Sequence, residues 1–422
     1  MGLGKTFVGS EKLNELGEKI NLVICQKSKI KDWIDHFNEY YPNYEVWDLT
    51  NKTEHCIFLS QNGMIKNAKI KIIGVINYDL IFRRKQLMKE INNFTLMLDE
   101  SSIIQNETSK RSKAILKLKP KNVILLSGTP TSGKYENLWS QCKLLGWNIS
   151  KKLYWSQYIV LEYLDIGTEF MVPVVKGYKN VTRLKEKLRE YGSIFMKTNE
   201  VMNLPKQIDQ FISVKKTKEY NKFYKDSIIT ITEEGNIFKD DSDFYGKDVT
   251  PRIELVGDTT LTKRLYLRML ASGYNINKLE ALKDLFNSTE DRLIVFYNFN
   301  QELHNLKKLV PKEKPISIIN GEIKDLENYE SYNNSITFIQ YQAGAMGLNL
   351  QKSNKIIYFS LPERSELFEQ SKKRTHRIGQ TKSCFYYYMI AKNSIDEDIF
   401  ETLKMRRNYT DELFRQKHAK II

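Results

Sequence analysis

The sequence predicts an α/β protein of two lobes with a largely helical insertion between them. Short apolar runs alternate with polar, helix-like segments near the start of the chain, and the same alternation resumes after about residue 280. Continuous apolar runs of this kind suit strands that are buried on both faces of a parallel sheet. Between the two regions this alternation is absent, and the sequence contains amphipathic charged stretches such as 183–189. The predicted bounds are 1–150 for the first lobe, 151–280 for the helical protrusion and linker, and 281–422 for the second lobe.

Individual elements follow from the same patterns. Strands are predicted in the first lobe at 21–26, 71–76, 95–99 and 122–126, and in the second at 293–297, 316–319, 336–339, 355–359 and 384–389. A closing helix is predicted over 395–407, because acidic residues lie at its start and basic ones at its end, as a helix dipole favours. The polar segment 233–260 is predicted to be an exposed loop.

Composition narrows the class of protein. The chain has 422 residues, of which 41% are hydrophobic and 12% aromatic, as in a folded globular protein of more than one domain. Lys and Arg number 66 against 51 Asp and Glu, a formal charge of +15. This excess fits either a solvated lysine-rich surface or a polyanionic partner such as nucleic acid. The four cysteines and five histidines show no metal-ligand spacing, which predicts reduced thiols in a reducing compartment. No apolar run reaches membrane-spanning length, and the N-terminus does not read as a signal peptide.

A basic stretch near the C-terminus, QSKKRTHRIGQ at 370–380, carries the most specific pattern. If this stretch is helical, Gln370, Arg374 and Arg377 share one face, because they are spaced four and three residues apart. Two guanidiniums aimed the same way suit an anion with spread charge, such as a phosphoryl group in transfer.

The chain opens with glycines and a Lys-Thr pair that are typical of a phosphate-binding loop. Gly2 and Gly4 let the backbone approach phosphate oxygens, Lys5 would reach the β- and γ-phosphates, and Thr6 would ligate Mg²⁺. The small residue that usually begins such a loop and the strand before it are absent, so we expect a truncated start to the first lobe. An ordinary glycine turn is the alternative interpretation.

Two further segments support a phosphate site. Asp99 and Glu100 end an apolar run, where Asp99 would hold Mg²⁺ and Glu100 would orient and deprotonate a water molecule. A solvated strand end is the alternative. The turn after 122–126 carries the hydroxyls of Ser127 and Thr129, which can hydrogen-bond the carboxylate site and the opposing lobe.

Together these segments resemble the Swi/Snf-like branch of the superfamily two helicase-related ATPases. The resemblance is carried by GLGKT at 2–6, LDES at 98–101, LSGTP at 126–130, QAGAMGLNLQ at 342–351 and the stretch at 370–380, with weaker matches at 22–33, 75–78, 196–206 and 294–299. The resemblance covers nearly the whole chain. The compact form of the chain is most similar to phage, bacterial or DNA-rewinding members of the family. The chain departs from the family at Ser101 and Ser102, where an Ala-His pair is usual.

The resemblance implies a fold of two RecA-like lobes, parallel sheets flanked by helices, that close around ATP and Mg²⁺. It implies catalytic roles for Glu100, Gln370 and the arginine fingers Arg374 and Arg377, and nucleotide binding by Gly2, Gly4, Lys5, Thr6 and Gly347. It further implies Mg²⁺ binding by Thr6 and Asp99, coupling by Ser127 and Thr129, and DNA contacts by Lys27, Ser28, Tyr78, Asn298 and Gln342.

The activity implied by the resemblance is ATP-driven translocation on double-stranded DNA without strand separation, in the cytoplasm of a bacterium or infected host, or in the nucleus of a eukaryote. Two alternatives remain at this point. One is a DNA-binding fragment without ATPase activity, disabled by the incomplete phosphate loop. The other is a strand-unwinding helicase or the motor subunit of a restriction system.

Overall fold

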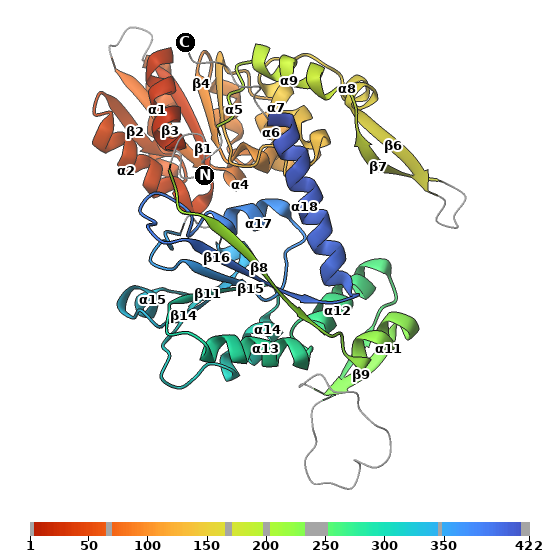
Figure 1. Ribbon diagram of the computed structural model, residues 1–422. Helices are drawn as coiled ribbons and strands as arrows, with labels where there is room; N and C mark the ends of the chain where they lie inside the picture. The colour runs from red at the N-terminus through yellow and green to blue at the C-terminus, as the bar shows by residue number, and fades with distance from the viewer. Residues whose placement is uncertain are drawn as a thin grey trace. The chain divides into compact units, whose positions relative to one another are not determined.

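The computed structural model describes residues 4–64, 70–164, 171–196, 203–232, 252–344 and 348–414 (Figure 1). The chain divides into two compact units. The first comprises Met1–Val201 together with Arg406–Ile422, and the second comprises Met202–Met405.

The first unit is built on a five-stranded parallel sheet with the order β2-β3-β1-β4-β5. Its strands are β1 (Ile20–Cys25), β2 (Tyr44–Asp48), β3 (Lys71–Asn77), β4 (Thr95–Asp99) and β5 (Asn122–Leu126). All four strands predicted for this lobe are confirmed. β2 was not predicted, because its sequence alternates apolar and polar residues and only Tyr44 is fully buried.

Short helices connect these strands. They are α1 (Lys5–Leu16), η1 (Lys27–Lys29), α2 (Ile30–Tyr40), α3 (Lys52–Met64), α4 (Tyr78–Ile81), α5 (Lys85–Glu90), η2 (Ser101–Ile104) and α6 (Lys110–Ile115). Helix α1 packs closely on the sheet through Gly9, where an added Cβ would lie 2.6 Å from Leu126 Cδ1 and 3.0 Å from Met97 Sδ. A larger residue at this position would therefore require the Leu126 side chain or α1 itself to shift.

A satellite region completes the first unit. It contains η3 (Tyr135–Leu138), α7 (Trp139–Leu144), α8 (Lys151–Tyr158), the antiparallel hairpin β6 (Ile159–Leu164) and β7 (Val172–Tyr178), and α9 (Val181–Glu190). These elements share their own aromatic core, in which the rings of Tyr135 and Tyr178 stack with centroids 4.1 Å apart.

The second unit is built on a seven-stranded sheet with the order β13-β12-β14-β11-β15-β16-β8. The strands are β8 (Gln207–Val214), β11 (Leu293–Tyr297), β12 (Ile316–Ile319), β13 (Lys324–Asp325), β14 (Ile336–Gln340), β15 (Lys355–Tyr358) and β16 (Cys384–Ala391). All pairings are parallel except that of β12 with β13. The five strands predicted for this lobe are confirmed.

The remaining elements of the second unit flank this sheet or form a small hairpin module. They are α11 (Lys218–Asp226), β9 (Ile228–Thr232), β10 (Arg252–Val256), α12 (Thr260–Ala271), α13 (Ile276–Asn287), α14 (Asn300–Lys308), α15 (Glu327–Ser331), α16 (Tyr341–Gly344), α17 (Ser365–Lys372) and the part of α18 (Ile395–Phe414) that precedes Arg406. The predicted closing helix is confirmed as α18, which runs beyond 407.

The two compact units meet in the sequence at Val201/Met202, and β8 belongs to the second sheet because it pairs along its whole length with β16. The three-part division at 150 and 280 stays a prediction. Residues 233–251 of the predicted loop lie outside the described residues. The rest of that prediction is wrong, since Arg252–Val256 forms β10, which pairs antiparallel with β9.

Candidate functional site

The start of α1 has the backbone geometry of a phosphate-binding loop. Gly4 has φ 68° and ψ 27°, in the left-handed region that favours glycine, and the helix begins at Lys5. The backbone N–H groups of a first helical turn have no partners within the helix and attract anions. Gly2 lies outside the described residues.

Lys5 reaches the end of β4. Its Nζ lies 3.4 Å from Oε1 of Glu100, and both side chains are about one-fifth to one-quarter exposed. Residues predicted from two separate motifs, 95 positions apart, therefore meet at one place in the first unit. This ion pair gives Lys5 a partner that nucleotide phosphates can replace.

Asp99 and Glu100 are held differently, although they are adjacent. Trp33 Nε1 donates to Asp99 Oδ2 at 3.0 Å, and the Tyr78 hydroxyl donates to the Asp99 carbonyl at 2.8 Å. Glu100 has φ 55°, an unusual backbone conformation for a residue with a side chain. Within the described residues, the buried Oε2 of Glu100 has no hydrogen-bond partner. That oxygen is thus available to accept a proton.

Burial raises the pKa of Asp99, the bond from Trp33 opposes this effect, and the Glu100 carboxylate raises the pKa further. A buried carboxylate of this kind gains most from a cation, which restores the stabilisation that water would give it. Thr6 and Asp99 supply the hard oxygen donors that Mg²⁺ prefers. No cluster of three or more His, Cys, Asp or Glu side chains suited to a metal occurs in the described ranges.

We expect Asp99→Asn to stabilise the nucleotide-free protein at neutral pH. The folded pKa of Asp99 lies above the unfolded value of 3.8, so stability falls as pH rises through the interval between them. Asparagine keeps an acceptor for Trp33 and removes this loss. Thermal unfolding measured from acid to neutral pH should show that Asp99→Asn is more stable than the unsubstituted protein at neutral pH. This difference in stability should disappear below pH 3.8. An equal gain at every pH would show that ionisation of Asp99 is not the cause.

The turn after β5 is held by amide side chains that the sequence analysis missed. Gln105 and Gln141 each donate to the Pro130 carbonyl, at 3.0 and 2.8 Å. Ser101, one of the two departures from the family pattern, donates to Gln141 Oε1 at 2.9 Å. The Asp-Glu segment is thereby connected to the 126–130 turn. Within the turn, Ser127 Oγ accepts from the Thr129 N–H at 3.1 Å. The buried Thr129 Oγ1 has no partner among the described residues.

The residues predicted to contact DNA in the first unit divide into two groups. Lys27 and Ser28 are exposed in η1, as a contact requires. Tyr78 is 2% exposed and its hydroxyl is bonded to the Asp99 carbonyl. A direct contact of Tyr78 with DNA is therefore wrong, and the side chain instead supports the Asp99 segment.

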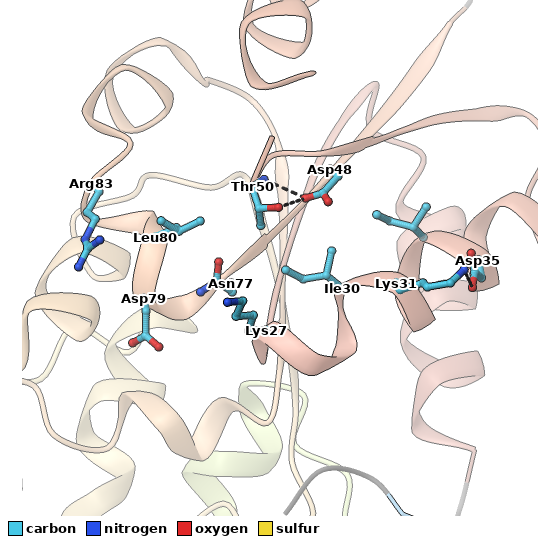
Figure 2. Close-up of a pocket in the computed structure, with 11 residues that line it drawn as sticks. Lys27, Ile30, Lys31, Asp35, Asp48, Thr50, Asn77, Asp79, Leu80 and Arg83 are labelled. Carbon is cyan, nitrogen blue, oxygen red and sulfur yellow. Dashed lines mark hydrogen bonds and ion pairs between the residues drawn. The ribbon is translucent and has the colours of Figure 1, made fainter. Parts of the chain in front are cut away.

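A cavity of about 750 Å³ lies beside Lys27, at the ends of β2 and β3 (Figure 2). In it, Lys31 is paired with Asp35 at 2.7 Å, whereas Lys27 and Arg83 take part in no ion pair within the described ranges. The full lining is Lys27, Ile30, Lys31, Ile34, Asp35, Asp48, Thr50, Asn77, Asp79, Leu80 and Arg83.

In the second unit, the shared helical face predicted for Gln370, Arg374 and Arg377 is wrong. Helix α17 ends at Lys372, and both arginines lie in the turns that follow. Gln370 is 5% exposed and donates to Glu366 Oε1 at 3.3 Å, which makes it part of the helix packing. Arg377 is half-buried, donates to Asn349 Oδ1, and has a pKa lowered by burial.

Polar contacts fix the turns that carry these arginines. His376 bonds Gln207 Nε2 through Nδ1 at 2.7 Å and the Pro205 carbonyl through Nε2 at 2.8 Å. Gln380 donates to the carbonyls of Gln351 and Ser353, each at 3.0 Å. The motif residues His376 and Gln380 thus hold the backbone, and β8 helps to position the segment.

The other predicted residues of this unit are placed as follows. The Asn298 side-chain amide donates to Ser360 Oγ at 2.8 Å and to the Leu361 carbonyl at 3.0 Å. These bonds occupy both hydrogens of the Asn298 side-chain amide, and the DNA contact of Asn298 stays a prediction. Gln342 in α16 is exposed. Gly347 lies outside the described residues.

None of the described helices is both long and apolar enough to cross a membrane.

Comparisons with known proteins agree with the motif analysis. Residues 1–270 match the SNF2-related domain, and residues 277–379 match the helicase conserved C-terminal domain. A mouse SWI/SNF-related regulator of chromatin, subfamily A member 1, is 23% identical over 96% of this chain and 40% of its own length. The putative helicase/translocase YwqA of Bacillus subtilis is 23% identical over 82% of this chain and 38% of its own length.

The chain thus spans about 40% of the length of these curated relatives. Among solved structures, it is similar to the Sulfolobus solfataricus SWI2/SNF2 ATPase core in complex with dsDNA. That match has a TM-score of 0.41 and 20% identity, and it covers 97% of this chain and 86% of the other. Because the SNF2-related domain alone matches well over half of the sequence, the chain belongs to the Swi/Snf-like branch of the superfamily two helicases.

Proposed function

We propose that the chain hydrolyses ATP when it is bound to DNA and uses this reaction to move along double-stranded DNA. The observation that carries the proposal is the meeting of Lys5 with Glu100 beside Asp99 at the end of β4. Proteins named as helicase or translocase among the relatives, such as YwqA, support it. So does the formal charge of +15, which suits a polyanionic partner.

In this proposal, Lys5 leaves Glu100 and binds the nucleotide phosphates, while Thr6 and Asp99 hold Mg²⁺. Held by these residues, Mg²⁺ would supply positive charge against the charge that develops on the phosphate oxygens. Glu100, with its unpartnered Oε2, accepts the proton of the attacking water. Arg374 and Arg377 stabilise the transferring phosphoryl group, a contribution of about 10³–10⁵ in rate for one arginine finger.

Exposed Lys27 and Ser28 in the first unit and Gln342 in the second are proposed to follow the DNA backbone. Phosphate contacts release counterions, so log affinity should fall with log salt by roughly 0.9 for each phosphate neutralised on B-DNA. Lys27→Ala should lower this slope by about 0.9 without changing sequence preference.

Displacement of a third strand from a DNA triplex tests the translocation step. We expect displacement that requires ATP and that Glu100→Gln abolishes. A forked duplex should release no single strand under the same conditions. ATP hydrolysis without triplex displacement would contradict translocation, and release of single strands from the fork would favour the unwinding alternative.

A further inference from the structure

An exposed group of aromatic rings lies beside the phosphate-binding end of α1. Phe7 directly follows Thr6 and is 47% exposed, and Tyr40 at the end of α2 is 51% exposed. Large apolar side chains exposed this far gain from an occupant that covers them. Phe7 therefore follows directly on the two residues, Lys5 and Thr6, that would hold the phosphates of a nucleotide.

The rings form one compact set with His36 of α2. The Phe7 ring centroid lies 4.8 Å from that of His36 and 5.0 Å from that of Tyr40, at interplanar angles of 83° and 73°. His36 and Tyr40 centroids are 5.1 Å apart. At these steep angles, neither His36 nor Tyr40 is stacked parallel on the Phe7 ring, which is 47% exposed. Exposed aromatic surface therefore remains for a further planar group.

Hydrogen bonds fix this ring set relative to the phosphate-binding turn. His36 Nε2 bonds Ser10 Oγ at 2.9 Å, and Ser10 Oγ in turn donates to the Thr6 carbonyl at 2.9 Å. Burial lowers the pKa of His36, which favours the neutral ring. The position of the rings is thus coupled to the residues that would hold phosphate and Mg²⁺.

We propose that Phe7 and Tyr40 form a stacking platform for the base of the bound nucleotide. This inference rests on the proposed function and adds the recognition of its substrate. Stacking on an aromatic ring tolerates any base, since every base presents a π-face. The platform should therefore strengthen binding of both ATP and GTP, and contribute nothing to a phosphate chain without a base.

Calorimetric titration with a non-hydrolysable ATP analogue and with tripolyphosphate, both with Mg²⁺, tests the platform. Phe7→Ala and Tyr40→Ala should each lower the affinity for the ATP analogue by about tenfold and leave the affinity for tripolyphosphate unchanged. Phe7→Trp should retain nucleotide affinity. Tyr163→Ala, which removes an exposed ring on β6, is the matched control and should change neither affinity.

Equal weakening of nucleotide and tripolyphosphate in both alanine variants would show that the rings only support the phosphate turn, and would overturn the platform. Unchanged affinity for both ligands would overturn it as well. If the unsubstituted protein bound neither ligand, the proposed function itself would fail, and the platform with it. The two failures are thereby distinguished.

Discussion

Glu100→Gln is expected to reduce DNA-stimulated ATP hydrolysis by about 10²–10⁴ while leaving nucleotide binding intact. Such a loss corresponds to about 3–5 kcal/mol of activation barrier. The reason is that glutamine keeps the shape of the side chain but cannot accept a proton from water. The left-handed backbone of Glu100 and its buried, unpartnered Oε2 both indicate a side chain that is placed for chemistry.

The measurement is steady-state turnover with saturating duplex DNA, together with nucleotide affinity by calorimetry. Glu15→Gln is the matched control, because Glu15 forms an exposed ion pair with Lys12 on the same helix as Lys5. Exposed pairs of this kind contribute little to stability or function. Turnover of the Glu100→Gln protein within a few-fold of the unsubstituted protein would remove Glu100 from its proposed role.

Asp396→Ala should cost the second unit about 3–5 kcal/mol of unfolding free energy. Lys278 Nζ lies 2.6 Å from Asp396 Oδ2, and the two side chains are 0% and 5% exposed. Asp396 Oδ2 also accepts from the Ala391 N–H at 3.1 Å. Removing the carboxylate leaves the buried Lys278 ammonium and the buried Ala391 N–H without this acceptor. It also weakens the packing of the start of α18 against α13.

Denaturant unfolding followed by circular dichroism measures this cost, and hydrogen exchange in α13 and α18 localises it. Asp398→Ala, two residues further along α18 and exposed, should leave stability nearly unchanged. Replacing both partners, as in Lys278→Met with Asp396→Leu, should recover much of the loss, since a buried pair is often no better than apolar packing. A loss as small as that of Asp398→Ala would show that water or another group compensates Lys278.

The sequence predicted the strands well where the signal was a continuous apolar run, as in Ile20–Cys25 and Leu293–Tyr297. Strands β2 and β8 lacked that signal, because an edge strand exposes one side and mixes polar with apolar residues. The pairing of β8 with β16 depends on contacts more than 170 residues apart, so local pattern could not reveal it.

In the candidate site, too, local motifs revealed some features, whereas others depend on long-range contacts. Gly4, Lys5, Asp99 and Glu100 were identified from their local motifs, and the structure brings Lys5 and Glu100 together. The burial of Tyr78, by contrast, follows from distant packing. The early end of α17 also depends on long-range bonds, since Gln380 holds the following turns against the carbonyls of Gln351 and Ser353. Helical spacing alone therefore assigned a shared face that the chain does not form.

The comparison of ATP hydrolysis with and without duplex DNA, in the unsubstituted protein and in Lys5→Ala, tests the central claim most directly. The site at the end of β4 predicts hydrolysis that duplex DNA stimulates several-fold and that Lys5→Ala eliminates. Hydrolysis that is indifferent to DNA, or that persists unchanged without the Lys5 ammonium, would contradict the account.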